Sequence, residues 1–163
     1  MHVILVRHAE AVNVGEEGVA SDFDRHLTAH GREQAAKLAE AFAARKVAPS
    51  VIVSSPLVRA QQTAGPLMRL LPTPTAVPAV CGYLAPGELK RRKLTKFVEG
   101  LHADVAVLVG HNPDLSEYAE WLIGADAGAV ELEKAAAAAF RFDGPAGKAS
   151  GALEWLLTPA WFM

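Results

Sequence analysis

The chain has 163 residues, of which 51% are hydrophobic and 21% are charged, and its formal net charge is −2. This length fits one domain with a core that needs neither disulfides nor metal, and the charge argues against a nucleic-acid-binding protein. A single cysteine, Cys81, excludes an internal disulfide, and no apolar run approaches the roughly 20 residues of a membrane span. We therefore expect one domain over residues 1–163, no membrane partner and a cytoplasmic location, since the first residues resemble a strand rather than a signal peptide.

The opening segment combines a buried strand with two costly polar residues. Val3 to Val6 is an uninterrupted apolar run, which predicts a central strand buried on both faces. The run ends at Arg7-His8, a pair that is costly in a core unless a negative group lies nearby. Open α/β sheets place their ligand sites at the carboxyl edge of the strands. The sequence therefore predicts an anion site there, covered by a loop over residues 9–26.

The next part of the chain predicts two helices separated by a short strand. Thr28 predicts the N-cap of the first helix, and apolar residues at helical spacing follow it to Phe42. Residues 51–53 predict a buried strand. Ser54-Ser55-Pro56 then predicts the cap and first turn of the second helix, which Gly65-Pro66 should interrupt because proline removes a backbone donor.

The segment after residue 74 continues the alternation of strand and helix. Residues 75–80 predict a strand near the sheet edge because they include Pro78. A loop leads to Glu88 and a helix that runs to about Leu101. Residues 105–109 predict another buried strand, and Asn112-Pro113 predicts the cap and first turn of the helix that follows.

The tail carries two competing signals. Residues 131–139 are rich in helix formers, whereas Phe140-Arg141-Phe142, a glycine- and proline-containing turn and residues 153–157 predict a closing β-hairpin. We favour the hairpin. The predicted fold is therefore α/β, a single-domain three-layer α/β/α sandwich with a mainly parallel central sheet, helices on both faces and a C-terminal β-hairpin.

Polar groups gather where three predicted strands end. Arg7 and His8 follow the first strand, Arg59 lies in the first turn of the helix after the second, and His111 follows the strand at residues 105–109. A cation in the first turn opposes the helix dipole, so Arg59 makes more sense if it faces a bound anion. Arginine holds phosphate oxygens bidentately and histidine exchanges protons near neutral pH. Two arginines together with two histidines predict phosphoryl-transfer chemistry without a metal.

Four ordered sequence blocks resemble the signature of the histidine phosphatase superfamily, relatives of the cofactor-dependent phosphoglycerate mutases. The short length and the form of the last block are most similar to the SixA-type phosphohistidine phosphatases. The resemblance implies the phosphoglycerate mutase-like fold. The blocks are Arg7-His8-Ala9-Glu10, Leu27-Thr28-Ala29-His30-Gly31 with Gln34-Ala35, the run from Ser54-Ser55-Pro56 to Thr63, and Val109-Gly110-His111-Asn112-Pro113.

The resemblance implies a role for each matching residue. His8 would be the nucleophile and would become phosphohistidine during turnover, while Arg7, Arg59 and His111 would complete the phosphate pocket. No metal or cofactor is implied. Ala9 stands where the superfamily usually has glycine, which predicts a turn without a positive φ.

Three further assignments concern the loops. Asn13 lies near the place of a phosphate-contacting asparagine in larger relatives, and Arg25 is a candidate for the pocket mouth. Glu88 is the nearest match to the glutamate that donates a proton in many superfamily members. Asp22 and Asp24 are the alternative proton donors.

The leading functional hypothesis is a metal-independent phosphatase that acts on a phosphorylated histidine-containing protein. Two alternatives remain open: a small-molecule phosphate-ester hydrolase that uses the same His8 chemistry, and a non-catalytic phosphate-binding interaction module. A separate feature is the basic run Lys90-Arg91-Arg92-Lys93, which is either a solvated helix face or a surface that attracts an acidic or phosphorylated partner.

Overall fold

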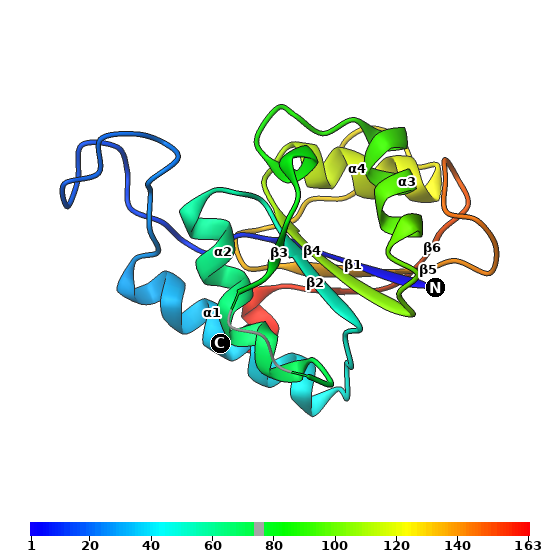
Figure 1. Cartoon of the computed structure of the whole chain (residues 1–163), viewed down its shortest axis with the longest axis horizontal. Helices are drawn as coiled ribbons and strands as arrows, with labels where there is room; N and C mark the ends of the chain where they lie inside the picture. Colours follow the sequence, from blue (N-terminus) through cyan, green and yellow to red (C-terminus); the bar gives the residue numbers. More distant parts are fainter. Residues whose placement is uncertain (74–76) are drawn as a thin grey trace.

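A single mixed sheet forms the centre of the protein in the computed structural model, which describes residues 1–73 and 77–163 (Figure 1). Its strand order in this part of the chain is β3-β2-β4-β1-β5-β6. The first four strands in that order are parallel, and the last two pair antiparallel as the predicted C-terminal hairpin. The strands are β1 (His2–Arg7), β2 (Val51–Ser54), β3 (Ala79–Val80), β4 (Val105–Gly110), β5 (Ala137–Arg141) and β6 (Ala152–Leu157).

Helices cover both faces of the sheet, which confirms the predicted three-layer α/β/α sandwich. Figure 1 shows α1 and α2 on one face and α3 and α4 on the other. None of the helices in residues 1–73 and 77–163 combines the length and apolar character needed to cross a membrane. The helices are α1 (Ala29–Ala44), α2 (Val58–Ala64), α3 (Arg91–Gly100) and α4 (Asp114–Ile123), with 3-10 turns η1 (Gly65–Leu70), η2 (Gly82–Leu84) and η3 (Pro159–Trp161).

The central strands are buried on both faces, as their apolar runs predict. In β1, Val3 and Leu5 pack with the residues of α3 and α4, whereas Ile4 and Val6 pack with those of α1 and α2. Alternate side chains of β4 divide between the two layers in the same way. A strand covered on both sides has no solvent-facing position, so its sequence shows no polar alternation.

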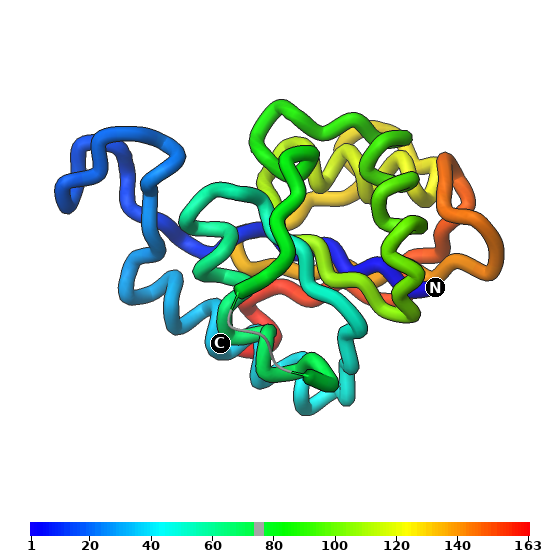
Figure 2. Tube along the Cα trace, viewed as in Figure 1, coloured from blue at the N-terminus to red at the C-terminus, as the bar shows by residue number. Residues whose placement is uncertain are grey.

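The pairing of β1 with β4 brings two distant segments to the same level. Arg7 is in register with Gly110, and the amide of His8 donates to the carbonyl of Gly110 at 3.0 Å. Because the strands are parallel, the residues that follow them, His8 and His111, leave the sheet side by side. The long loop after β1 extends from this edge, as the tube in Figure 2 shows.

Several helix starts differ from the sequence predictions, because their cap residues bind elsewhere. Thr28 is the N-cap of α1, as predicted, and accepts from the amide of Gly31. The predicted cap at Ser54-Ser55 is wrong, since α2 begins at Val58 with Leu57 in the cap position. The predicted interruption at Gly65-Pro66 is confirmed by the change from α2 to η1.

The second half of the chain shows similar shifts. The helix predicted from Glu88 begins only at Arg91, and Pro113, not Asn112, occupies the cap position of α4. The side chain of Asn112 donates instead to the carbonyl of Leu132 at 2.9 Å. Of the strand predicted over residues 75–80, β3 covers Ala79–Val80 at the sheet edge, and residues 75 and 76 lie outside the described residues.

The alanine run before residue 140 forms a strand despite its helical propensity. Ala137 to Arg141 pair with β1 on one side and β6 on the other. Their alternate side chains are buried in both apolar layers, with Ala138 on the α3–α4 side and Ala139 on the α1–α2 side. Tertiary pairing therefore overrides local propensity at this segment.

Gly31 permits a close approach between α1 and the loop after β1. A Cβ atom at Gly31 would lie 1.9 Å from the carbonyl oxygen of Glu10. We expect Gly31→Ala to lower the free energy of unfolding by about 1–3 kcal/mol, because a main-chain segment must move. Gly100→Ala is the matched control, because no atom lies within 4 Å of the added methyl group. Urea denaturation that gives the two variants equal stability would contradict this close approach.

Candidate active site

His8 follows β1 with its ring held in one tautomer. It is 7% exposed, and its Nδ1 lies 2.7 Å from the carbonyl oxygen of Ala9. Because a carbonyl oxygen can only accept, Nδ1 carries the proton and Nε2 keeps its lone pair. Arg59 Nε lies 3.3 Å from that Nε2 and donates to it. The unprotonated nitrogen of the ring is therefore Nε2, and it faces a guanidinium group.

His111 lies beside His8 and is oriented by a serine. The two ring centroids are 5.0 Å apart, and His111 is 3% exposed. Its Nε2 lies 2.8 Å from Ser55 Oγ, which also accepts from the amide of Leu57. Among the described contacts, His111 Nε2 is the acceptor within reach of the Ser55 hydroxyl proton, so we assign the hydroxyl as the donor. This arrangement places the ring proton of His111 on Nδ1.

Arg59 connects the nucleophile to the loop after β1. Arg59 is 4% exposed, and each of the three nitrogens of its guanidinium forms a hydrogen bond. Nε bonds to His8, Nη1 donates to the carbonyl of Asp22 at 2.7 Å, and Nη2 donates to the carboxylate of Asp22 at 3.1 Å. Asp22 therefore occupies donor positions that a bound phosphoryl group would use.

Arg7 is braced from behind by the segment before β5. Its Nη1 donates to the carbonyl of Leu132 at 2.9 Å, the same carbonyl that accepts from Asn112. Ser116 completes the brace, since it donates to Asn112 and accepts from the amide of Leu132. A cavity of about 540 Å³ opens beside Arg7 and Asn112. Nη1 of Arg7 is thus held in place, while Nε has no partner among the described residues.

Two buried donors of this site have no partner. Among the described residues, the buried side-chain nitrogen and oxygen atoms without a hydrogen bond are Arg7 Nε and His111 Nδ1. Leaving a buried polar group unpaired costs roughly 1–3 kcal/mol. Both atoms belong to the set predicted from sequence, and both can donate to an anion. Beside the Arg59 guanidinium, these two atoms leave the site with hydrogen-bonding capacity that the described residues do not use.

Burial keeps both histidines neutral. It lowers the pKa of His8 from 6.5 to about 4, with the charges of Arg59 and Arg7 acting in the same direction and the bond to Ala9 opposing them. Burial also lowers the pKa of His111 to about 3, helped by His8 and Arg59. A neutral imidazole is the form that attacks phosphorus. The environment therefore keeps His8 in this neutral form at neutral pH.

Asp22 is an ionised carboxylate in this arrangement. Partial burial by itself raises the pKa of Asp22, but hydrogen bonds and charge from Arg25 and Arg59 lower it below its usual range. Arg25 Nη1 lies 3.0 Å from its carboxylate, and Arg25 Nε donates to the carbonyl of Val12. Arg25 thus lies at the mouth of the site, and Asp22 is an acceptor there, not a ready proton donor.

Other predicted loop residues are not brought to the site. Glu88 is exposed in the loop before α3, where its amide closes a turn with Ala85. Asn13 is exposed, and its side chain donates to Glu16 at 3.3 Å. Asp24 accepts from Ser21 at 2.6 Å. The described contacts therefore link none of these three residues to His8, Arg59 or His111.

Sequence reasoning missed the groups that hold the site in place. Thr63 accepts from the amide of Ala9 at 3.0 Å and donates to the carbonyl of Arg59, which ties the nucleophile turn to α2. Ala9 itself needs no positive φ, as predicted. The carbonyl of Leu132 had no signal in the sequence, because a backbone contact leaves no side-chain signature. Ser55 lies in the sequence block that runs from Ser54 to Thr63, but its hydrogen bond with His111 appears only in the folded structure.

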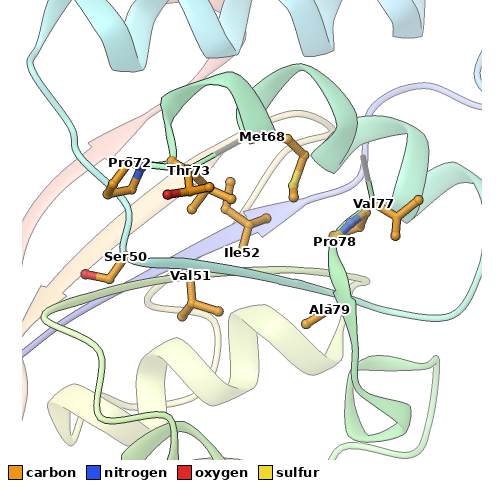
Figure 3. A pocket seen from close by; sticks show the side chains of 10 residues that line it. Ser50, Val51, Ile52, Met68, Pro72, Thr73, Val77, Pro78 and Ala79 are labelled. Carbon is orange, nitrogen blue, oxygen red and sulfur yellow. The ribbon is translucent and has the colours of Figure 1, made fainter. Parts of the chain in front are cut away.

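A second cavity lies at the opposite end of β2 and carries none of this chemistry. It has a volume of about 560 Å³ and is lined largely by apolar side chains, among them Ile52, Met68 and Pro78 (Figure 3). Ser50 and Val51 mark the amino end of the strand, whereas Ser54 and Ser55 mark the end near His111. The lining includes no ionisable side chain, so this cavity is separate from the candidate active site.

Part of the chain matches a known protein family. Residues 3–78 match the model of the histidine phosphatase superfamily (branch 1), and the matched segment includes Arg7, His8 and Arg59. Solved structures extend the likeness in fold over nearly the whole chain, including β4 and His111. The chain is similar to the histidine phosphatase superfamily in sequence over residues 3–78 and in fold over nearly its whole length.

The solved structures that are similar to this chain in fold include the following three. The protein histidine phosphatase SixA, complexed with tungstate, matches with a TM-score of 0.83 and 22% identity over 98% of both chains. The α-ribazole phosphatase of Shigella flexneri matches with a TM-score of 0.72 and 20% identity over 98% of this chain and 97% of that one. A phosphoserine phosphatase mutant of Entamoeba histolytica matches with a TM-score of 0.71 and 15% identity over 99% of both. These likenesses show the phosphoglycerate mutase-like fold.

Among curated relatives, the match is partial. The mitochondrial serine/threonine-protein phosphatase Pgam5 of Drosophila ananassae is 35% identical over 86 residues, which are 53% of this chain and 28% of that protein. The Drosophila willistoni protein is 34% identical over the same shares. The chain thus corresponds to little more than a quarter of these histidine phosphatase relatives.

The low pKa values of the two histidines predict a specific pH response. We expect carbon-13 NMR signals of His8 and His111 to stay in the neutral form from pH 8 to about pH 5, whereas a free imidazole titrates near 6.5. Between about pH 6.5 and 4 the unfolded chain binds protons on these rings and the folded chain does not. The free energy of unfolding should therefore fall as pH falls through this window. Titration of both rings near 6.5 would contradict their burial as the controlling factor.

The contact between Asp22 and Arg59 predicts competition with phosphate. In Asp22→Ala the internal carboxylate is gone, so inorganic phosphate or tungstate should bind about 2- to 5-fold more tightly, the effect expected from an ion pair whose carboxylate is more than half exposed. Asp24→Ala is the control, because it removes the same charge from the same loop but not a contact to Arg59. Isothermal titration calorimetry should separate the two variants. Equal affinities would show that Asp22 does not compete.

Proposed function

We propose that this chain, over residues 1–163, is a metal-independent phosphatase that hydrolyses phosphohistidine on another protein through a phosphohistidine intermediate on His8. The observation that carries the proposal is the pair of unpartnered buried donors, Arg7 Nε and His111 Nδ1, beside a neutral His8. These donors and the Arg59 fork suit a phosphoryl group with three oxygens. Cytoplasmic location stays a prediction.

The first step transfers the phosphoryl group to the enzyme. The Nε2 lone pair of His8 forms a bond to phosphorus while the bond from phosphorus to the substrate nitrogen breaks. Arg59 gives up its bond to Nε2 and, with Arg7 and His111, donates to the equatorial oxygens. These donors are fixed before the substrate arrives, so they need little reorganisation as charge moves onto the oxygens.

The leaving group supports phosphohistidine as the substrate. The imidazole of a phosphohistidine can itself take a proton near neutral pH and leaves as a neutral ring, whereas an alkoxide needs a proton from an acid. Of the carboxyl groups in the described residues, the one bonded to the pocket arginine is Asp22, and its low pKa keeps it ionised. Glu88 is exposed and outside contact with the histidines. An N-linked phosphate needs no such acid.

The second step restores the enzyme. A water attacks phosphorus, the bond to His8 Nε2 breaks, and its electron pair returns to the ring. The proton lost by the water balances the one taken up by the departing substrate imidazole. The products are inorganic phosphate and the unmodified histidine of the substrate. The likeness in fold to SixA, named a protein histidine phosphatase, supports this assignment.

An ester phosphatase is the second candidate. The partial match to Pgam5, named a serine/threonine-protein phosphatase, favours it, as does the tether between the Glu88 turn and α4, in which the amide of Gly87 donates to Asp114 at 2.6 Å. That tether keeps Glu88 near the sheet edge that carries His111. An ester substrate would require Glu88, or Asp22 after displacement from Arg59, to supply the proton.

His8→Ala should abolish turnover. We expect at least about a 10³-fold loss in kcat/KM on a phosphohistidine-bearing phosphotransfer protein, because the covalent route is removed. His30→Ala is the control, since this histidine is exposed on α1. The wild type should also yield phosphorylated His8 by mass spectrometry at alkaline pH, and a chelator should leave the rate unchanged.

Three results would redirect the proposal. Full activity of His8→Ala, or dependence on added magnesium, would exclude the mechanism. No phosphorylated His8 and no turnover would favour a non-catalytic phosphate-binding module. A kcat/KM for phosphoserine peptides far above that for phosphohistidine peptides would favour the ester phosphatase, and Glu88→Gln should then lower that value.

A further inference from the structure

The first turn of α3 concentrates positive charge where a helix disfavours it. Lys90 is at the N-cap position, Arg91, Arg92 and Lys93 follow, and Lys96 lies one turn on, with no acidic residue in the first turn. All five are exposed. Cations at a helix N-terminus oppose its dipole, and like charges at i,i+4 and i,i+3 repel each other. The helix would be more stable by itself without this arrangement.

Few of these cations are compensated within the protein. Arg91 Nη2 lies 3.3 Å from Glu117. The side chains of Lys90, Arg92, Lys93 and Lys96 form no hydrogen bond or ion pair with the described residues. In a chain of net charge −2, this is a local excess of the opposite sign. The excess makes physical sense if an external anion contacts α3.

Another cation faces the same helix from the β5–β6 connection. Lys148 lines a cavity of about 490 Å³ together with Arg92 and Lys96. The indole of Trp121 contributes to the same cavity and stacks on Tyr118 with ring centroids 5.9 Å apart. We call Lys90, Arg92, Lys93, Lys96 and Lys148 the α3 basic surface.

The neighbouring acidic groups are largely committed to internal contacts. Glu99 accepts from the amide of Ala146 at 3.0 Å, and Glu117 pairs with Arg91. Glu120 is 6% exposed and accepts from the amides of Gly128 and Val130. Asp126 remains exposed on the α4 side of an adjoining cavity. Of the two adjoining cavities, the side formed by α3 is therefore basic and the side formed by α4 is not.

The α3 basic surface lies within reach of the candidate active site. The Arg91–Glu117 pair places the first turn of α3 beside the first turn of α4, which begins three residues after His111. The tether from Gly87 to Asp114 holds the preceding loop against the same end of α4. In Figure 1 both helices lie on one face of the sheet. A protein bound at His8 can therefore touch α3 as well.

We propose that the α3 basic surface docks an acidic patch on the protein whose phosphoryl group enters the site at His8. This inference rests on the proposed function and adds the chemistry by which the substrate protein is selected. A discrete acidic patch can contact the α3 side alone. An extended polyanion such as RNA or an anionic membrane would also meet Asp126 and the net negative charge of the chain.

The test compares three synthetic phosphohistidine peptides that differ only in a short flanking segment of glutamate, glutamine or lysine. The segment is placed about 4, 8 or 12 residues from the phosphohistidine, which spans roughly 13 to 40 Å in extended chain. The variant is Arg92→Gln with Lys96→Gln. The matched control is Lys46→Gln with Arg69→Gln, which removes the same charge from exposed positions outside the α3 basic surface.

At low salt the wild type should favour the glutamate peptide over the glutamine peptide by about 3- to 10-fold in kcat/KM, through KM, at one or more spacings. The preference should disappear in the α3 variant and at high salt, and persist in the control. Thermal denaturation should show both variants folded. No preference at any spacing, or an equal loss in both variants, would overturn the proposal.

A binding measurement keeps this proposal separate from the catalytic one. Fluorescence anisotropy of a labelled, unphosphorylated glutamate-rich peptide should show binding to the wild type and to His8→Ala, and weaker binding to the α3 variant. If no phosphohistidine peptide is hydrolysed but this pattern holds, the proposed function fails and the docking surface stands. Stronger binding of a single-stranded RNA or of phosphatidylserine vesicles than of the peptide would overturn the docking proposal.

Discussion

Uncompensated donors at the end of a rigid sheet are the constraint on which the rest of this structure depends. Arg7 Nε and His111 Nδ1 are buried without partners, and each lowers stability in the absence of an anion. They stay in place because β1 and β4 are covered on both faces and paired in fixed register. The apolar layers thus hold a polar constellation that would otherwise relax into water.

The same framework fixes the protonation state of the two histidines. The Ala9 carbonyl accepts from Nδ1 of His8 and the Ser55 hydroxyl contacts Nε2 of His111, so both rings carry their proton on Nδ1, and burial keeps both rings neutral. Asp22 supplies a negative group to Arg59 when no phosphoryl group is present. The free protein therefore holds His8, Arg59 and Asp22 in one hydrogen-bonded unit, and in the proposed function a phosphoryl group would replace the Asp22 carboxylate.

Charge outside the pocket is organised on a different principle. In the pocket, cations are buried and fixed by hydrogen bonds, which suits a small group held in one geometry. On α3 the cations other than Arg91 are exposed and unpaired, which suits a larger partner attracted at longer range. Phosphoryl recognition and protein recognition would then be served by separate elements joined through the α3–α4 contact.

The sequence by itself determined the buried strands and the sandwich architecture, and it predicted Arg7, His8, Arg59 and His111 as candidate site residues, because apolar runs and strand-end polar residues are local features. It misplaced the starts of α2 and α4, since the serine and asparagine expected as caps bind groups far along the chain. It also placed the start of α3 at Glu88, whereas the helix begins at Arg91.

Only the tertiary structure decided how the site is supported and which loop residues reach it. The carbonyl of Leu132 holds Arg7, and Asp22, not Asn13 or Glu88, contacts the pocket arginine. Sheet pairing also made residues 137–141 a strand against their helical propensity. The physical reason is common to these cases: backbone partners, loop paths and pairing energies depend on residues distant in the chain, which no local pattern encodes.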